Sequence, residues 1–414
     1  MDLVKSLLLG SDSIPHAAPG TAGSAPSSPA NSPRPRTKPK YDPLYLTKVF
    51  IFAVLWIAIP FATVVVGATI LPFEIITQKR TLIREVQKAF GSFVVVTVYL
   101  FLPQTELVLT GDWTHLEATK KTIAIANHQI YPDWMYLWVL AWWRNLHGDL
   151  RIILIKVLSL LPILGQGIQL FDWIFVHQKL DKDREIIRQN LTTAKNDVGN
   201  PLFLLIFPEG TLNTPGNVEK SKLYAEKMRI SPHPQHVILP KSTGLYLALQ
   251  DLSPSVDNLF DLTVGYSGVS STDVPFAVFP PDKLFFEDRY PSEIHIHVTK
   301  YSVRDLPGFR ATDEVSSNDE GLKKEFDTWL RSVWMEKDNR MKYFYDYGWM
   351  VDTLKSVDGV TYVKVVPKLL DWLYFWGLLF IAWIVVPIYG QIIWWALWAV
   401  CNGFYYVISR AFSL

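Results

Sequence analysis

The sequence predicts an α/β fold in which a mainly parallel sheet is flanked by helices, with membrane helices at both ends of the chain. Between residues 106 and 341, short apolar runs with the length of buried strands alternate with stretches of helical periodicity. Polar motifs follow two of these runs directly, at 127–134 and 207–211. Uncharged apolar runs of greater length lie towards both ends of the chain. Strands that alternate with helices at this spacing favour a parallel sheet with helices on both faces.

The expected elements follow from this alternation. Strands are expected at 106–110, 122–127, 173–177, 202–207, 236–240, 260–265 and 293–299. Helices are expected at 133–146, 150–160, 182–196, 218–228, 242–250 and 319–341. Functional sites in such sheets gather at the carboxyl ends of the strands, where both polar motifs lie.

The N-terminal part divides into a tail and a membrane region. Residues 1–42 are rich in Ser, Pro and Ala, so they cannot bury a core and are expected to be disordered. Residues 43–105 are expected to hold N-terminal membrane-embedded helices. The apolar run at 49–71 is long enough for about one bilayer crossing, whereas the run at 91–102 is short for a span. The two runs form an embedded hairpin, or the first spans and the second lies in the interface.

The C-terminal part is expected to cross the membrane twice. Residues 106–345 form a folded domain, and residues 346–368 a connector. Residues 369–414 contain two uncharged apolar segments with Tyr389-Gly390-Gln391 between them. The absence of charge and the many aromatic residues favour a transmembrane hairpin over two packed core helices.

Composition agrees with a membrane protein. Hydrophobic residues make up 49% of the 414 residues, and the chain has 16 tryptophans, the residue that favours membrane interfaces. The net charge of +1 gives no field that would attract nucleic acid. A single cysteine excludes an internal disulfide, which fits a domain that faces the cytosol.

The first motif has the parts of a general base and its partner. His128 and Asp133 are five residues apart, and Pro132 between them suits the start of a helix. His128 then lies in the loop after a strand and Asp133 in the first helical turn, within reach of each other. A carboxylate that holds one imidazole nitrogen leaves the other able to take a proton. The only cysteine lies in an apolar terminal segment, so the proton is expected to come from a substrate hydroxyl.

Both motifs together resemble the glycerolipid acyltransferases of the 1-acylglycerol-3-phosphate acyltransferase family. These are the His-x-x-x-x-Asp pattern from His128 to Asp133 and the Phe-Pro-Glu-Gly-Thr pattern at 207–211. Further pieces are similar to the lysocardiolipin and lysophosphatidylinositol acyltransferase branch: Lys156 with 161–165, then 173–177, 224–227, 240–244 and 293–298. The resemblance covers roughly residues 106–345 and implies the glycerolipid acyltransferase fold.

The resemblance also implies a reaction. It implies acyl transfer from acyl-CoA, as co-substrate, to the free glycerol hydroxyl of an anionic lysophospholipid. Lysophosphatidylinositol is favoured, followed by lysophosphatidic acid or lysocardiolipin. A CoA-independent transacylase and an inactive lipid-binding membrane protein are the alternatives. No bound cofactor, metal or nucleic acid is expected, and the expected location is the endoplasmic reticulum membrane.

Roles for individual residues follow from the same resemblance. His128 and Asp133 are the expected catalytic residues, and Glu209 matches the glutamate that the family assigns to acceptor binding. Backbone N–H groups at Gly210 and Thr211 are candidate donors to an oxyanion. Where the family usually has an arginine after the third strand, this chain has Gln178 followed by Lys179. Lys179 and Lys241 are therefore the candidate cations for the substrate phosphate.

Overall fold

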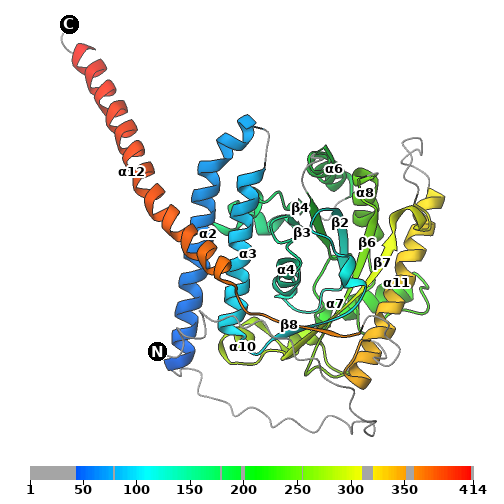
Figure 1. Ribbon diagram of the computed structural model, residues 1–414. Helices are drawn as coiled ribbons and strands as arrows, with labels where there is room; N and C mark the ends of the chain where they lie inside the picture. The colour runs from blue at the N-terminus through cyan, green and yellow to red at the C-terminus, as the bar shows by residue number, and fades with distance from the viewer. Residues whose placement is uncertain are drawn as a thin grey trace.

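A computed structural model describes residues 43–77, 80–177, 180–196, 201–253, 255–309, 320–350 and 359–411 (Figure 1). Three expectations lie outside these ranges, namely the disordered tail at 1–42 and the roles of Gln178 and Lys179.

The centre of the protein is an eight-stranded sheet with the order β4-β3-β5-β2-β6-β7-β1-β8. The strands are β1 (Glu106–Gly111), β2 (Lys121–Ala126), β3 (Leu150–Ile155), β4 (Ile174–Val176), β5 (Leu202–Ile206), β6 (Asn258–Tyr266), β7 (Glu293–Ser302) and β8 (Thr361–Lys364). In the described part of the chain, the pairs β6–β7 and β1–β8 are antiparallel and the other pairs are parallel. The expected α/β class is therefore confirmed, with a sheet that is mostly parallel but mixed.

Helices cover both faces of this sheet. Around the sheet lie α4 (Asp133–Trp143), α5 (Leu164–Leu170), α6 (Leu180–Asn196), α7 (Pro215–Lys227), α8 (Ser242–Leu252), α9 (Pro275–Val278), α10 (Pro281–Phe286) and α11 (Glu320–Tyr347), with short 3₁₀ turns η1 (Asp112–His115), η2 (Lys156–Leu160) and η3 (Val303–Asp305). In β2, Ala124 and Ala126 belong to the buried cluster shared with α4, and Ile123 and Ile125 to the cluster shared with α6, α8 and α11. This alternation is the two-residue period of a strand buried on both faces.

Two expected elements are wrong, and one strand was not expected. Residues 150–160 form β3 and the turn η2 instead of a helix, because a short apolar run does not by itself distinguish a strand from a buried helix. Residues 236–240 form no strand: the backbone N–H groups of His236 and Val237 donate to Asp338 Oδ1, and that of Leu239 donates to Ser221 Oγ. Strand β8, inside the expected connector, pairs with β1 at the sheet edge.

The two N-terminal helices lie side by side, as Figure 1 shows, but their surroundings differ. Helix α2 (Pro43–Thr77) exposes apolar side chains such as Phe50, Ile57 and Ile76, and is long and apolar enough to cross a membrane. Helix α3 (Thr81–Phe101), which contains all but the last residue of the short run 91–102, is largely buried. A single buried cluster contains residues of α3, α4 and the sheet. Helix α3 therefore packs as part of the folded domain that was expected to begin at residue 106.

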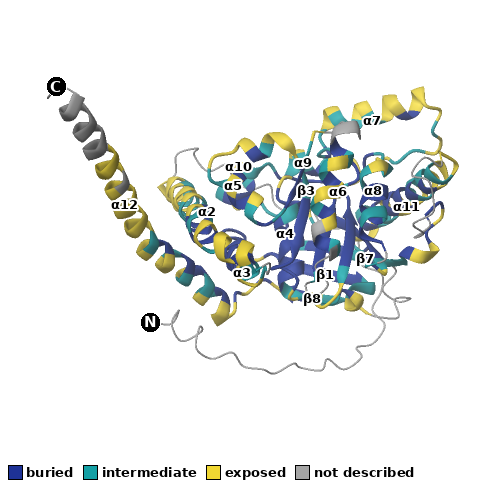
Figure 2. Cartoon of the chain, turned by 90° about the horizontal axis from the view of Figure 1, so that it is seen from above, coloured by how far each residue is buried: buried dark blue, intermediate teal, exposed yellow. Residues whose placement is uncertain are grey.

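The prediction of a C-terminal transmembrane hairpin at 369–414 is wrong. Residues Leu369–Ala411 form one continuous helix, α12, that runs through Tyr389-Gly390-Gln391 without a turn. One glycine costs a helix only about 1 kcal/mol, which is too little to impose a reversal. The first turns of α12 pack on α2 and α3 through Phe375, Leu378 and Ala382, and the helix then extends from the body, with exposed apolar side chains such as Trp383, Trp394 and Val400 (Figure 2).

Candidate active site

His128 lies in the loop at the carboxyl end of β2, and Asp133 is the first residue of α4. The two side chains meet: His128 Nδ1 is 2.9 Å from Asp133 Oδ2. The Asp133 side chain is fully buried, whereas 23% of the His128 side chain is exposed. The sequence-based prediction of their proximity is confirmed, and the exposed imidazole is the part that a substrate can reach.

Three further donors hold the Asp133 carboxylate. The backbone N–H groups of Gln129 (2.5 Å) and Ile130 (3.1 Å) donate to Oδ2, and the Tyr266 hydroxyl donates to Oδ1. Burial, followed by the charge of Asp133, raises the pKa of Tyr266 well above its usual value, so the phenol keeps its proton and remains a donor. Tyr266 comes from β6, and nothing in the local sequence signals its role.

Glu209 follows β5 and is almost fully buried, at 1% exposure. Its Oε2 accepts the backbone N–H of His128 at 3.2 Å, and its Oε1 accepts the indole N–H of Trp334 at 3.3 Å. Burial raises the pKa of Glu209 to about 8, because the charged carboxylate loses its hydration. The side chain therefore lies beneath the His128 loop. Its contact with an acceptor stays a prediction.

The rest of the Phe-Pro-Glu-Gly-Thr loop is a tight turn next to His128. The N–H of Gly210 donates to Phe207 O at 2.9 Å, and the φ of +64° at Gly210 suits glycine. The N–H of Gly210 thus closes the turn. The hydroxyl of Thr211 accepts from Asn217 Nδ2 at 2.7 Å. The role of the Thr211 backbone N–H as an oxyanion donor stays a prediction.

Lys241, one of the two candidate cations, lies next to the same loop. Its backbone N–H donates to Pro208 O at 2.8 Å, and its exposed side chain passes over Gly210. A Cβ atom built on Gly210 would be 3.4 Å from Lys241 Nζ. The ammonium group therefore lies near the exposed side of the loop that carries Glu209.

Backbone contacts join the two motif loops. The N–H of Asn213 donates to His128 O at 2.8 Å, and its side-chain amide donates to Gln129 Oε1 and to His236 O, both at 3.1 Å. The ring of His128 also stacks on Phe207, with centroids 4.5 Å apart. Asn213 is a further site residue that the motif search missed, although it lies only two residues beyond the second motif.

The described residues contain no group of three or more His, Cys, Asp or Glu arranged to hold a metal ion. His295 and His297 contact Glu293 and Thr110, respectively. Burial lowers the pKa of His297 to about 3, so it is neutral near pH 7.

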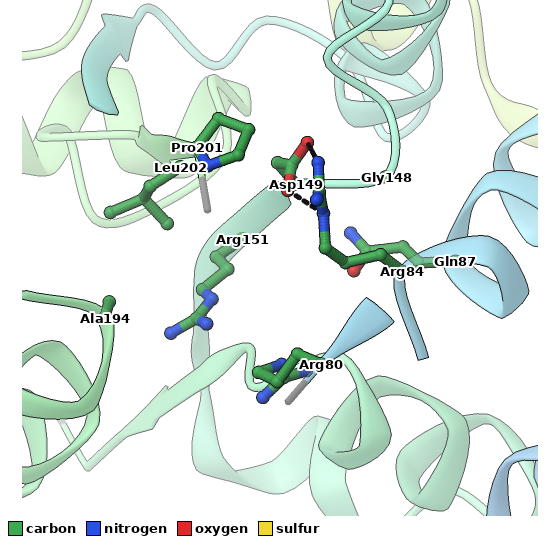
Figure 3. A pocket seen from close by; sticks show the side chains of 9 residues that line it. All are labelled: Arg80, Arg84, Gln87, Gly148, Asp149, Arg151, Ala194, Pro201 and Leu202. Carbon is green, nitrogen blue, oxygen red and sulfur yellow. Dashed lines mark hydrogen bonds and ion pairs between the residues drawn. The ribbon is translucent and has the colours of Figure 1, made fainter. Parts of the chain in front are cut away.

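A separate polar hollow lies at the opposite end of the strands (Figure 3). It is bordered by the beginnings of β3 and β5 and by Arg80, Arg84 and Arg151. Ion pairs nearly balance its charge: Arg84 with Asp149 at 2.6 Å, and Arg80 and Arg151 with Asp172. These ion pairs attach α3 and the residue before it to the segments that precede β3 and β4. They lie at the end of the strands opposite to His128.

Comparison with known proteins agrees with this geometry. A family model described as Acyltransferase matches residues 110–245, which include His128, Asp133, Glu209 and Lys241. The chain is 33% identical over 280 residues to 2-acyl-1-lysophosphatidylinositol acyltransferase of Saccharomyces cerevisiae, covering 60% of this chain and 67% of the relative. It is 31% identical over 264 residues to probable 1-acyl-sn-glycerol-3-phosphate acyltransferase 5 of Arabidopsis thaliana, covering 63% of each chain.

Lysocardiolipin acyltransferase 1 of Gallus gallus is 29% identical over 246 residues, covering 59% of this chain and 58% of the relative. The match to the plant and chicken proteins thus spans less than two thirds of their length. The chain belongs to the 1-acylglycerol-3-phosphate acyltransferase family, in the branch of the lysocardiolipin and lysophosphatidylinositol acyltransferases.

Proposed function

We propose that this protein transfers an acyl group from acyl-CoA to the free glycerol hydroxyl of an anionic lysophospholipid. The observation that carries the proposal is the His128–Asp133 pair, with a buried carboxylate and a partly exposed imidazole at the carboxyl end of β2. In this arrangement Asp133 fixes Nδ1, and Nε2 is the nitrogen that can receive a proton.

The proposed reaction needs one proton transfer in each direction. His128 takes the proton of the acceptor hydroxyl while the oxygen attacks the thioester carbonyl carbon. Asp133 stabilises the resulting imidazolium. When the carbon–sulfur bond breaks, the CoA thiolate leaves and receives that proton from His128. The products are a phospholipid and free CoA, and the enzyme returns to its starting state.

Other groups at the site are candidates to stabilise the two remaining negative charges, on the tetrahedral intermediate and on the acceptor phosphate. The tetrahedral intermediate carries an oxyanion, for which the backbone N–H of Thr211 is the candidate donor. Lys241 is the candidate cation for the acceptor phosphate, because its exposed ammonium group lies against the Gly210 turn. Lys179 is the second candidate cation. A substitute cation is needed because Gln178 stands where the family usually has an arginine.

The acceptor is inferred from the relatives. Their names specify lysophosphatidylinositol, acylglycerol phosphate and lysocardiolipin, which share a glycerol backbone and a phosphate. The greatest identity among these three is to the lysophosphatidylinositol enzyme, at 33%. Lysophosphatidylinositol is therefore the first acceptor to test, ahead of lysophosphatidic acid and lysocardiolipin.

The proposed setting is a membrane. Two helices among the described residues, α2 and α12, are long and apolar enough to cross one. Lipid substrates require a site that opens near the bilayer, and the exposed apolar surfaces of these helices support such a position. We place the protein in the endoplasmic reticulum, with the sheet and its site facing the cytosol.

The test is an acyl transfer assay with the purified full-length protein in lipid vesicles. Labelled oleoyl-CoA is supplied with each of the three lysophospholipids, in both positional isomers where these exist. Labelled product is expected with lysophosphatidylinositol, and none is expected from His128→Ala. A second arm supplies labelled phospholipid as donor without CoA, and product in that arm alone would identify a transacylase. No product from any donor and acceptor would contradict the proposed function.

A further inference from the structure

Helix α11 lies outside the region that the family model matches, yet it contacts Glu209 in the second motif loop and the neighbouring segment 235–237. The contacts come from Trp334 and Asp338, which are four residues apart and therefore share one face of the helix. Both side chains are buried.

The first contact reaches His128 through Glu209. The indole N–H of Trp334 donates to Glu209 Oε1, and Glu209 Oε2 accepts the backbone N–H of His128. The Trp334 side chain is 125 residues away from Glu209 in the sequence. A hydrogen bond from a fixed indole sets where this carboxyl group lies, and the carboxyl group sets where the His128 backbone lies.

Lys337 fixes the indole in turn. Its ammonium nitrogen lies 5.1 Å from the centre of the Trp334 ring. The Lys337 side chain is fully buried and pairs with Asp261 Oδ1 at 2.6 Å, and it donates to Leu262 O at 2.8 Å. Both partners belong to β6, the strand that also carries Tyr266. This buried pair holds α11 to the sheet directly beneath the site.

The second contact orders the loop at 235–237. Asp338 Oδ1 accepts the backbone N–H groups of Gln235 (2.8 Å), His236 (2.6 Å) and Val237 (3.3 Å). The carbonyl oxygen of His236 then accepts from the side chain of Gln129, which follows His128 in the first motif loop, and from that of Asn213, which lies just beyond the second motif. Asp338 thus supports the catalytic loop through the backbone of His236.

We propose that α11 positions the general base of this enzyme, with Trp334 acting through Glu209 and Asp338 acting through the loop at 235–237. Both side chains are buried and act through other groups of the protein, so both are positioning residues. The inference rests on the proposed function for its kinetic test, whereas chemical modification of His128 tests it without turnover.

The kinetic test compares two tryptophans of the same helix. Trp334→Phe removes the N–H donor to Glu209 and keeps an aromatic ring, whereas Trp329→Phe alters a half-buried tryptophan that packs on Tyr301. Loss of one hydrogen bond to the buried Glu209 carboxyl should lower kcat about tenfold in Trp334→Phe. The KM values of both substrates should stay within about twofold of the wild-type values. The reason is that the proposed substrate-binding groups of the protein lie on the exposed side of the loop.

Two aspartates provide the matching pair for the second contact. Asp338→Asn weakens the acceptor of three N–H groups, and Asp327→Asn alters a half-buried aspartate of α11 that binds Ser242 and Arg331. Asp338→Asn should lower kcat, with both KM values retained, and Asp327→Asn should leave both parameters unchanged. Equal kcat values within each pair would overturn the proposal.

A chemical readout separates this inference from the proposed function. Diethyl pyrocarbonate modifies neutral, accessible imidazoles, and peptide mass spectrometry measures the rate at His128 against that at the exposed His115. Loosening the His128 loop should speed its modification at least about threefold in Trp334→Phe but not in Trp329→Phe. If no lysophospholipid is acylated, the proposed function fails while this comparison still reports on α11. Identical rates in wild type and both variants would overturn the positioning role.

Discussion

A single oxygen atom of Asp133, Oδ2, lies 2.9 Å from Nδ1 of His128 and also accepts the backbone N–H groups of Gln129 and Ile130. The carboxylate therefore holds both the imidazole and the backbone of the loop that carries it. This dual contact explains why the two residues form one structural unit at the start of α4.

The first prediction concerns this pair. His128→Ala should lower kcat by about two to four decades, the range typical for loss of a general base. Asp133→Asn should be nearly as damaging, because an amide cannot stabilise the imidazolium. Acyl transfer rates in vesicles measure both effects, with His115→Ala, an exposed histidine of η1, as control. Retention of more than about a tenth of the activity by His128→Ala would exclude the mechanism.

The second prediction concerns Tyr266. Tyr266→Phe removes the hydroxyl that donates to Asp133 Oδ1, and a buried carboxylate oxygen then lacks its partner. We expect kcat to fall about tenfold and the free energy of unfolding to fall by about 1–3 kcal/mol. Tyr136→Phe is the matched control, since the buried Tyr136 hydroxyl has no hydrogen-bond partner among the described residues. Equal effects of the two substitutions on stability and kcat would argue against the bond.

The third prediction concerns pH. Burial raises the pKa of Glu209 from 4.5 to about 8, so between these values the folded state binds more protons than the unfolded state. The contribution of Glu209 to stability therefore decreases as pH rises from about 4.5 to about 8. Glu209→Gln removes this dependence, so its stability relative to wild type should increase across that range.

Thermal unfolding of wild type and Glu209→Gln at several pH values between 5 and 9 measures this difference. Glu219→Gln, at an exposed position of α7, is the control and should follow the wild-type pH profile. A constant difference between wild type and Glu209→Gln across the range would show that Glu209 does not titrate there.

The fourth prediction concerns the substrate phosphate. Lys241→Ala should raise the KM of the lysophospholipid about tenfold, because one charge-assisted contact is lost, and leave kcat nearly unchanged. Lys179→Ala provides the comparison for the second candidate cation, and Lys227→Ala, an exposed lysine at the end of α7, provides the control. Unchanged KM values in Lys241→Ala and Lys179→Ala would mean that other groups hold the phosphate.

The fifth prediction concerns the orientation of the C-terminus. Helix α12 has 43 residues and a length of about 65 Å, enough for one crossing beyond the turns that pack on α2 and α3. A tag placed after residue 414 should therefore lie on the opposite side of the membrane from the sheet. Protease digestion of sealed microsomes tests this, with a tag in the α6–β5 connection as the reference. Cleavage of both tags in intact microsomes would support a hairpin.

The sequence was most informative about contacts between residues that are close together in the chain. The His128–Asp133 contact spans five residues, and a strand end, Pro132 and a helix start are enough to bring the two side chains together. The fold class was predictable for a similar reason, because alternating strand and helix patterns restrict the connections to parallel crossovers. The motif at 207–211 was placed at the same edge by the same rule, and the structure agrees.

Patterns failed where packing partners decide the outcome. The run at 150–155 became a strand because β4 and β5 flank it, and the segment at 236–240 stayed irregular because Asp338 accepts its N–H groups. The apolar segments on both sides of Gly390 gave no sign that they would form one helix. Hydrophobicity alone specifies burial or membrane contact, but not the partner or the direction of the chain.

The amino-acid sequence by itself determined the α/β class, the general base with its carboxylate, and the apolar helices. Only the tertiary structure decided what surrounds that base. Tyr266 reaches Asp133 across 133 residues and Trp334 reaches Glu209 across 125, and no local pattern encodes such contacts. Burial of Glu209 and its raised pKa likewise arise when α11 closes over the sheet, because desolvation depends on every element that excludes water from the carboxyl group.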